Sequence, residues 1–489
     1  MGSFSRVPVV DVHCGNINEV WASMVLAMSN SAFIALDCEL SGLGHRKKLN
    51  AKSIDDRYKN ICEVAKSRSI ISLGLSCYQL ITSPEGHSQP CGYIVQTFNI
   101  LLLCEEDYTV EPQSLKFLVQ HGFDFNKQYE KGLPYYRGPD KDTDFSIKSP
   151  RHLFRELVSM KVPVILHNGL VDLMFLYENL YTSLPTSSGT FLADLADMFP
   201  GGLVDTKYIT DYEHIMPASY LEYVFRKCQK DNTGADLKCV LHYPHYPATF
   251  PHVTYRDCSI RSTYNIADNP EAYKDCLCTT FAGHGWCEKD QFCPKSHNID
   301  LIIDMDVFGE TRKSRKRKRR KENREKRTQV NTGDECNTSM DSENTSLNNY
   351  SIENCGNGVE NSDEVMDDVI DDKGDNPDAA LRRKVSAEEI MKKLTEEKSK
   401  GTHGNGVHRA GYDAFMTGFI FAIYKSRCDG DEGVVQMEGW TNKLYLCGKD
   451  FPLTVTKSSF SKNSKQHLEK MSKIRKPQVE YSCCQPLMT

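Results

Sequence analysis

Two acidic side chains end an otherwise apolar segment near the start of the sequence. Residues 33–44 read FIALDCELSGLG, in which four apolar residues precede Asp37 and Glu39. Side chains at positions i and i+2 of a β-strand point to the same face, so both carboxylates would face one way. Like charges on a core strand repel each other and become protonated unless a cation neutralises them. The pair therefore predicts a cation site at the end of a buried strand.

Further groups of the same chemistry lie beside apolar segments much later in the chain. Asp172 opens a helix-like segment after the short apolar run VPVILH, and Asp413 lies in a strongly apolar segment that predicts a helix. His408 precedes Asp413 by five residues, and we expect it to lie in the loop before that helix. Taken singly, Asp172 also fits a helix cap, and His408 an ordinary residue at a helix start.

A cluster of these carboxylates would suit Mg²⁺, a hard cation that binds a few carboxylates and completes its octahedron with waters and phosphate oxygens. Two such ions about 4 Å apart can activate a water and stabilise the leaving oxygen when a phosphodiester is hydrolysed. A neutral histidine nearby can accept the proton of that water. Together the acids and His408 indicate metal-dependent cleavage of a phosphodiester.

A cysteine-histidine cluster follows in the middle of the chain. Its spacing is Cys278-x8-Cys287-x5-Cys293-x3-His297. Three thiolates and one imidazole complete a tetrahedral structural zinc site, and the metal supplies much of the folding energy of so short a segment. Cys276 is an alternative first ligand, with a gap of ten residues before Cys287. We predict one structural Zn²⁺ with the first spacing as its ligand set.

This spacing is that of CCCH zinc fingers, many of which bind single-stranded RNA. Such binding uses aromatic side chains that stack on unpaired bases. Phe281, Trp286 and Phe292 are the aromatic residues within the cluster. Each of them has the alternative role of covering the zinc ligands. The surrounding charge is not strongly basic, so we expect the finger alone to bind RNA weakly.

The segments that must position these groups alternate between strand-like and helix-like patterns. This order predicts an α/β domain with a mixed sheet, antiparallel at first and flanked by helices. Apolar runs predict strands at 32–40, 69–80, 93–103, 162–167 and 201–209. Apolar residues at helical spacing predict helices at 56–68, 114–123, 149–160, 171–181, 191–199 and 218–228.

Order returns late in the sequence with the apolar helix at 408–426, after a short helix at 386–401 and before strand-like segments at 442–448 and 451–460. The late helix needs a partner core, and the only large one lies in the first 230 residues, so the region between them is an insertion. We divide the chain into the first part of the α/β domain (1–235), an irregular linker (236–275), the finger (276–300), a basic and acidic disordered insertion (301–400), the final helix and strands of the domain (401–465) and a tail (466–489).

Charge is unevenly distributed along the chain. The formal net charge of the 489 residues is −6, yet residues 312–327 are almost all basic and residues 334–378 are rich in Asp and Glu. A dense Lys/Arg run commonly serves nuclear import or contacts phosphates, with a merely solvated charge run as the alternative. We therefore expect the nuclear import machinery and RNA as partners of residues 312–327.

Composition also bears on membranes and on the redox compartment. No stretch approaches the roughly 20 apolar residues of a membrane span, and the first residues lack the apolar core of a secretory signal. We therefore expect no membrane partner. The 19 cysteines are scattered through apparent core segments, which favours a reduced intracellular protein over a disulfide framework.

Three segments carry a family resemblance. ALDCELSG, VILHNGLVDLMFLY and HRAGYDAFMTG resemble the three motifs of the DEDD exonucleases, in the branch with a histidine five residues before the last aspartate. Within that superfamily the chain most resembles the CAF-type and poly(A)-specific ribonuclease deadenylases, and the CCCH cluster and basic run narrow the resemblance to nuclear ones. The resemblance implies an RNase H-like fold, two catalytic Mg²⁺ at Asp37, Glu39, Asp172 and Asp413, and His408 as the general base.

The resemblance also implies a function. It is that of a 3′-to-5′ exoribonuclease that trims oligo(A) tails and short 3′ extensions of small nuclear and related non-coding RNAs, releases 5′-AMP, and resides in the nucleoplasm, Cajal bodies and nuclear speckles. One alternative is a non-catalytic nuclear RNA-binding adaptor that uses the finger, which predicts RNA binding without a Mg²⁺-dependent product. Another is a DNA-directed exonuclease, which matched RNA and DNA substrates distinguish because only RNA offers a 2′-hydroxyl.

Overall fold

The computed structural model describes residues 5–81, 91–141, 148–233, 237–259, 264–310, 386–400, 409–428 and 437–475. His408, the basic run at 312–327 and the acidic stretch at 334–378 lie outside these residues, so the predictions made for them stay predictions. Within the described segments, no helix combines the length and the apolar character that crossing a bilayer requires.

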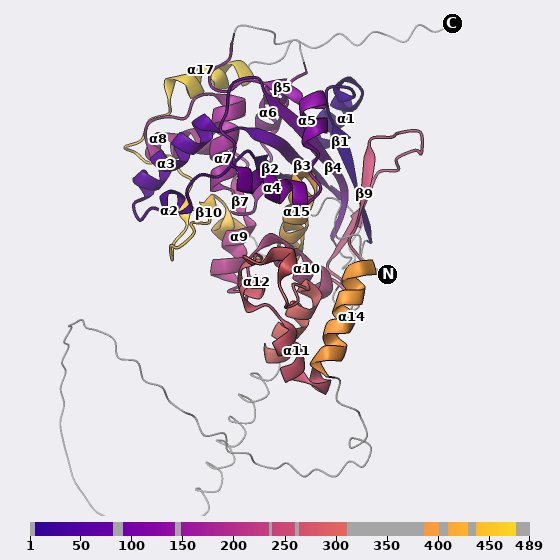
Figure 1. The fold of residues 1–489 in the computed structure, drawn as a ribbon. Helices are drawn as coiled ribbons and strands as arrows, with labels where there is room; N and C mark the ends of the chain where they lie inside the picture. The colour runs from indigo at the N-terminus through magenta and orange to yellow at the C-terminus, as the bar shows by residue number, and fades with distance from the viewer. Residues whose placement is uncertain are drawn as a thin grey trace, which may run out of the picture.

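A mixed sheet lies at the centre of the fold, in the strand order β11-β10-β7-β6-β2-β3-β4-β1-β9, with β5 and β8 also paired to β4 (Figure 1). β2 pairs antiparallel with β3, and β3 with β4, whereas β2 with β6, β6 with β7 and β1 with β4 are parallel. The expected α/β fold with a mixed sheet is therefore confirmed. The strands are β1 (Arg6–Val12), β2 (Phe33–Leu40), β3 (Ile70–Ile81), β4 (Cys91–Cys104), β5 (Leu133–Tyr135), β6 (Val164–Leu166), β7 (Leu203–Asp205), β8 (Cys239–His242), β9 (Val253–Asp257), β10 (Lys443–Leu444) and β11 (Leu453–Thr454).

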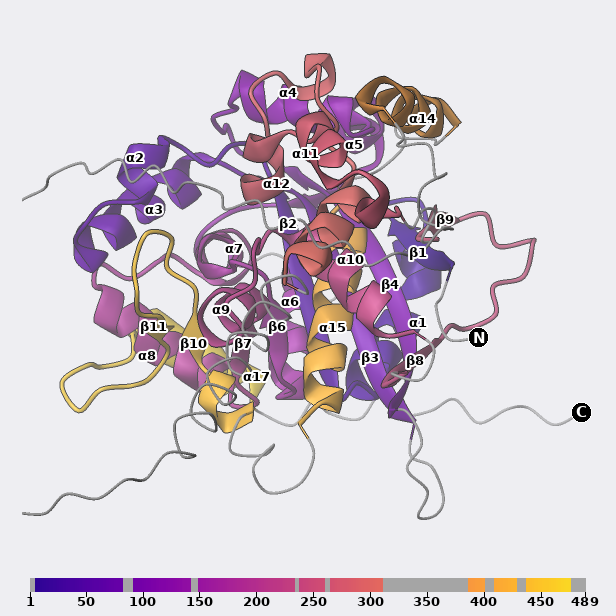
Figure 2. The ribbon, with the colours of Figure 1, turned by 90° about the horizontal axis from the view of Figure 1, so that it is seen from below.

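Helices cover both faces of this sheet (Figure 2). One face packs against α1 (Ile17–Ser29), α3 (Ile54–Ser67), α6 (Pro150–Met160), α7 (Leu170–Leu176) and α8 (Ser188–Met198). The other packs against α10 (Leu221–Asp231) and α15 (Ala410–Ser426), with α11 (Pro270–Cys276) and α14 (Ala387–Lys400) extending that second core. The shorter helices are α2 (Arg46–Leu49), α4 (Pro112–Gln120), α5 (Phe125–Lys131), α9 (Thr206–Tyr208) and α12 (Thr279–His284).

Alternation along β2 decides which core each of its side chains joins. Ile34, Leu36 and Cys38 belong to the first core, whereas Phe33 and Ala35 belong to the second, which contains α15. Because side chains alternate between faces along a strand, the next odd-numbered residues continue the face that α15 covers. The acids of the FIALDCEL segment therefore lie at the end of an apolar row beneath α15.

Helix α15 is buried along nearly its whole length. Every residue from Ala410 to Tyr424 is buried, because the helix crosses β2, β3 and β4 on one side and α10 covers its other side. This core is formed by strands from the first 104 residues of the chain. The late helix thus completes the early sheet, as its apolar sequence indicates.

The irregular linker expected at 236–275 is wrong in part, because this segment contributes two strands to the sheet. β8 pairs in parallel with the start of β4, and β9 pairs antiparallel with β1. Both are short, and most of their residues are half-buried or exposed. Their sequences therefore lack the apolar run that marks a core strand, and the hydrogen bonds of their neighbours hold them in place.

The disordered insertion expected at 301–400 is also wrong at both of its ends. Residues 299–310 are helical, and Leu301, Ile302 and Ile303 are buried in the second core. Helix α14 buries Ile390 and Leu394 in the same core and packs against α11. The insertion therefore leaves the domain and returns to it through ordered helices.

The tail expected at 466–489 begins within a helix, α17 (Lys465–Ile474). His467 is buried, and its ring nitrogens lie 3.0 Å from the Tyr181 hydroxyl and 2.9 Å from the Asp197 carboxylate. Lys470 is also buried and donates to Asp140 at 2.7 Å. Met471 joins the first core as well, so the helix is attached by polar pairs together with a small apolar contact, and the apolar periodicity of its sequence is weak.

Candidate functional site

The close approach of α15 to the sheet depends on two glycines. Asp37 of β2 is paired in register with Gly74 of β3. A Cβ atom on Gly74 would lie 1.8 Å from the carbonyl oxygen of Ala410, and one on Gly411 would lie 2.8 Å from the Cβ of Asn99. Because neither position carries a side chain, the first turn of α15 can rest directly on the sheet beside Asp37.

Asp413 joins Asp37 and Glu39 as a consequence. One carboxylate oxygen from each of the three lies within 4.8 Å of those of the other two. Asp413 is buried and the other two are half-buried. Burial and then the neighbouring Asp413, Asp172 and Glu39 carboxylates raise the pKa of Asp37 well above its ordinary value. The three carboxylates are therefore not all ionised unless a bound cation neutralises them.

Asp172 lies beside this group rather than within it. Its side chain is hydrogen-bonded to that of Cys38, the residue between the two β2 acids. Burial raises the pKa of Asp172 to about 7, and the Asp205 carboxylate adds to this effect while hydrogen bonds from Cys38 oppose it. Among the described residues, the three-acid group within 4.8 Å does not include Asp172, although its charge acts on Asp37.

Asp205 fixes the start of the helix that carries Asp172. Its carboxylate accepts hydrogen bonds from the backbone N–H groups of Asn168 at 2.8 Å and Gly169 at 3.2 Å, just before α7. It also accepts from Tyr445 N–H at 3.0 Å, which ties the turn to the segment around β10. Asn168 adopts a left-handed backbone conformation (φ 63°) that asparagine tolerates better than most residues. The tight turn therefore places Asp172 at the end of the sheet.

A polar network fixes the start of α15. Arg409, the N-cap residue, forms an ion pair with Asp11 of β1. Asn99 of β4 accepts a hydrogen bond from Gly411 N–H at 3.1 Å and donates to Asp11 at 3.5 Å. His408, which lies outside the described residues, immediately precedes Arg409 in the chain. The network therefore fixes the residue next to the expected general base.

The donor set of the acidic group fits a hard divalent cation. All of its ligand atoms are carboxylate oxygens, which Mg²⁺ and Mn²⁺ prefer over nitrogen or sulfur. Without such a cation, burial and then the crowded carboxylates raise the pKa of Asp37. Asp37, Glu39 and Asp413 would hold the cation directly, with Asp172 placed at its edge.

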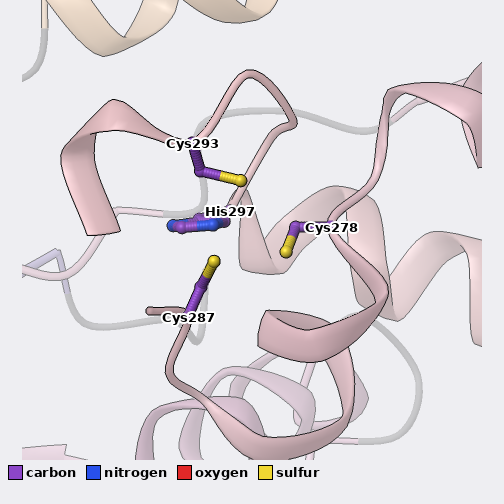
Figure 3. A group of neighbouring side chains, drawn as sticks. All are labelled: Cys278, Cys287, Cys293 and His297. Carbon is purple, nitrogen blue, oxygen red and sulfur yellow. The ribbon is translucent and has the colours of Figure 1, made fainter. Parts of the chain in front are cut away.

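The predicted zinc ligands converge in a second group. Cys278, Cys287, Cys293 and His297 surround a common centre (Figure 3), and one ligand atom from each lies within 4.8 Å of the others. Cys278 is buried and the other three are half-buried. Three sulfurs and one imidazole nitrogen in this arrangement fit a tetrahedral Zn²⁺.

The structure decides between alternatives that the sequence leaves open in this cluster. Cys276 is buried, and its thiol donates to the carbonyl oxygen of Ala387 in α14 at 3.5 Å, away from the four ligands. The ring of Phe281 stacks on the His297 ring, with centroids 4.3 Å apart and planes 5° apart. Phe281 therefore covers a zinc ligand, whereas Trp286 and Phe292 remain 49% and 83% exposed.

Several residues of the site give little signal in a single sequence. Gly74, Asn99, Asp11 and Arg409 look ordinary, because their roles arise only when β1, β3, β4 and α15 come together. Asp205 is the partial exception, since the segment LVDTKYI resembles a family segment between the second and third motifs. An acid as the last residue of a short buried strand is the signal for its capping role.

The sequence matches a known protein family over most of its length. Residues 12–149 and 143–421 match the profile of the CAF1 family ribonucleases. An uncharacterized protein of Schizosaccharomyces pombe is 30% identical over 128 residues, covering 26% of this chain and 30% of the relative. A pre-piRNA 3′-exonuclease trimmer of Bombyx mori is 26% identical over 143 residues, covering 27% of this chain and 25% of the relative. The chain thus spans less than a third of either relative.

Solved structures with a similar arrangement include two of Pop2. Pop2p of Schizosaccharomyces pombe, in a Mg²⁺- and Mn²⁺-bound form, matches 47% of this chain and 84% of its own, with 21% identity and a TM-score of 0.35. The RNase domain of the yeast Pop2 protein matches 45% of this chain and 74% of its own, with 16% identity and a TM-score of 0.31.

Proposed function

Because this chain belongs to the CAF1 family of ribonucleases, we propose that it is a divalent-metal-dependent 3′-to-5′ exoribonuclease that removes adenosines from RNA. One observation carries the proposal. Carboxylates from β2 and from α15, far apart in sequence, converge within 4.8 Å on one end of the sheet. Carboxylates that are buried this close together repel one another and raise the pKa of Asp37, which does not stabilise the fold. Such an arrangement is typical of a functional site.

The chain's own residues divide the work of the reaction. Asp37, Glu39, Asp172 and Asp413 would hold the divalent cations beside the scissile phosphate. When bound, the two cations would supply an activated water and charge stabilisation at the leaving oxygen. His408 accepts the proton of the attacking water, and its neighbour Arg409 forms an ion pair with Asp11.

The proposed substrates are small RNAs with oligo(A) tails or short 3′ extensions, small nuclear RNAs in particular. The resemblance to nuclear CCCH-finger deadenylases and the Cys₃His group support this class. The relative from Bombyx mori is by its name a trimmer of pre-piRNA 3′ ends, which is consistent with a small-RNA substrate. We propose the nucleus as the location, with import through the basic run at 312–327 and residence in nucleoplasm, Cajal bodies and speckles.

A time course on labelled RNAs tests the activity. Substrates labelled at the 3′ or the 5′ end, with tails of mixed sequence, are incubated with purified full chain with and without Mg²⁺. We expect single-nucleotide shortening from the 3′ end, faster through adenosine, and none without Mg²⁺. A matched DNA substrate should be degraded more slowly.

The Asp37→Ala variant is the control. Equal shortening by variant and wild type would contradict the assignment, and RNA binding without any Mg²⁺-dependent product would favour the adaptor function instead.

A further inference from the structure

A short basic helix follows the strand that carries the first two acids. Helix α2 begins at Arg46, seven residues after Glu39, and Arg46, Lys47 and Lys48 are all exposed. Seven residues span at most about 25 Å, so α2 lies within reach of an RNA strand whose 3′ end is at the acids. None of these three side chains forms an ion pair with an acidic residue that the structure describes. Their charges are therefore available to RNA phosphates.

The loop between the strand and α2 has a fixed conformation. Glu111 accepts hydrogen bonds from Gly44 N–H at 2.7 Å and Leu43 N–H at 3.2 Å, and its own charge is paired with Arg68. A Cβ on Gly42 would lie 2.6 Å from the Glu111 carboxyl carbon. The Glu111 side chain therefore occupies the space beside Gly42 and bonds to the N–H group of Gly44, so RNA does not contact these glycines. As a result, α2 is held at a defined place beside the site.

The zinc finger is positioned against the same edge of the domain. A Cβ on Gly285, which has φ 73°, would lie 2.6 Å from the ring of Tyr220, the residue before α10. The Tyr220 and Phe281 rings are also 6.0 Å apart. This packing brings Trp286 to α2, where the Arg46 guanidinium lies over the indole ring at 5.9 Å from its centroid.

We propose that α2 and the face of Trp286 form one RNA-binding surface that holds nucleotides 5′ of the scissile one. This inference rests on the proposed function, because it takes the acidic group as the position of the RNA 3′ end. Trp286 is half exposed and already faces a cation, so an unpaired base can stack on its ring while Arg46, Lys47 and Lys48 contact the adjoining phosphates. Phe292, still more exposed, would extend the stacking surface.

The proposal makes the enzyme sensitive to RNA length. A trinucleotide would occupy the acidic group alone, whereas a longer strand would also contact α2 and the finger. Each base stacked on an aromatic residue and each neutralised phosphate adds affinity, and the phosphate contribution falls with salt by about 0.7 in log K per log salt for each contact. Longer substrates should therefore have a lower KM with an unchanged kcat.

The experiment compares full-length variants on oligo(A) of 3 and 15 nucleotides. The first variant is Trp286→Ala, with Trp286→Phe to retain an aromatic face, and the second is the triple variant Arg46→Ala/Lys47→Ala/Lys48→Ala. The matched control removes an exposed aromatic and an exposed cation elsewhere, Phe460→Ala/Lys465→Ala, at residues that are 96% and 90% exposed. One Zn²⁺ per chain verifies that the finger is intact in every variant.

We expect the KM for the 15-mer to rise about tenfold in Trp286→Ala and in the triple variant. The KM for the trinucleotide should stay at the wild-type value, and the control should change neither. The triple variant should also flatten the salt dependence of 15-mer binding by about 0.7 per lost contact. Trp286→Phe should recover most of the loss.

Two results would overturn the proposal. In one, both oligonucleotides are bound and cleaved by the variants as by wild type; in the other, both KM values rise equally, which would indicate damage to the acidic group itself. If the wild type yields no Mg²⁺-dependent product, the proposed function fails. The binding surface is then still tested, by fluorescence polarisation of the labelled 15-mer with the same variants.

Discussion

The guanidinium of Arg409 forms an ion pair with the carboxylate of Asp11, although 398 positions separate the two residues in the chain. The pair joins the first strand to the residue that precedes the last long helix. Both side chains are largely buried, so removing one partner leaves the other charge poorly solvated. Arg409 is the N-cap residue of the helix that carries Asp413, and it is also the sequence neighbour of His408, the proposed general base.

We therefore predict that Arg409→Met lowers the free energy of unfolding by about 1–3 kcal/mol. We also expect kcat on oligo(A) to fall at least tenfold, with less change in KM. A double-mutant cycle with Asp11→Asn checks this, and a coupling energy of at least about 0.5 kcal/mol is expected. Simple additivity of the two single variants would contradict a direct role of the pair.

Gly74 gives a second prediction, about the packing of α15 on the sheet. Gly74→Ala places a methyl group where the backbone of Ala410 lies, so α15 must move or the sheet must distort. We expect a loss of about 3 kcal/mol in stability and a large loss of activity, since Asp413 moves with the helix. The matched control is Gly92→Ala in β4, where a Cβ meets Ile81 only at ordinary contact distance, 3.4 Å. Denaturant unfolding measures the stability of both variants. An equal loss of stability in the two variants would contradict this account.

The crowded carboxylates predict an effect of metal on stability. Asp37→Asn removes one of several mutually repelling acids, so in EDTA we expect the variant to melt at a higher temperature than wild type. Saturating Mg²⁺ should raise the melting temperature of wild type through preferential binding to the folded state, and that of the variant much less. Thermal melts in EDTA and in Mg²⁺ check this. A variant that gains as much from Mg²⁺ as wild type does would argue against Asp37 as a ligand.

Asp172 predicts a pH dependence with a defined sign. Its pKa is raised to about 7 in the folded protein, so between about pH 4 and 7 the folded state binds more protons than the unfolded state. This group therefore weakens the metal-free protein as the pH rises through that window. We expect the stability of Asp172→Asn relative to wild type, measured in EDTA, to increase from pH 4 to 7 and then to level off. A difference that is constant with pH would contradict the raised pKa.

The zinc cluster allows a test with two neighbouring cysteines. Cys278→Ser should abolish zinc binding, because this sulfur faces the other three ligands. Cys276→Ser should retain one Zn²⁺ per chain, since its thiol instead contacts the Ala387 carbonyl oxygen. Metal content after gel filtration decides the matter. Zinc retained by the first variant and lost from the second would reverse the ligand assignment.

A residue of this site can be predicted from one sequence when a local pattern fixes its position, and cannot be when its role depends on contacts between distant segments. Asp37 and Glu39 are visible because a strand pattern fixes their common face, and the cysteine spacing fixes the zinc ligands in the same local way. Gly74 and Asn99 act only through contacts with α15, so no local pattern marks them.

The same reasoning explains the errors in the fold. The helix that contains His467 and Lys470 is attached largely by buried polar pairs, and the edge strands at 239–242 and 253–257 are held by neighbouring backbone. Neither device leaves an apolar period in the sequence. The central strands and α15, in contrast, have long apolar runs because both of their sides are covered.

The late position of α15 has a consequence for biosynthesis. Translation that proceeds at about 5–20 residues per second needs roughly 20–75 s to pass from Asp37 to Asp413. During that interval the nascent chain has only part of its metal cradle, and the aromatic face of Phe33, Tyr78 and Tyr93 still lacks its covering helix. A nascent chain whose α15 has not yet emerged would therefore be unable to degrade RNA, including the message from which it is being read, and would depend on chaperones until that helix covers the sheet.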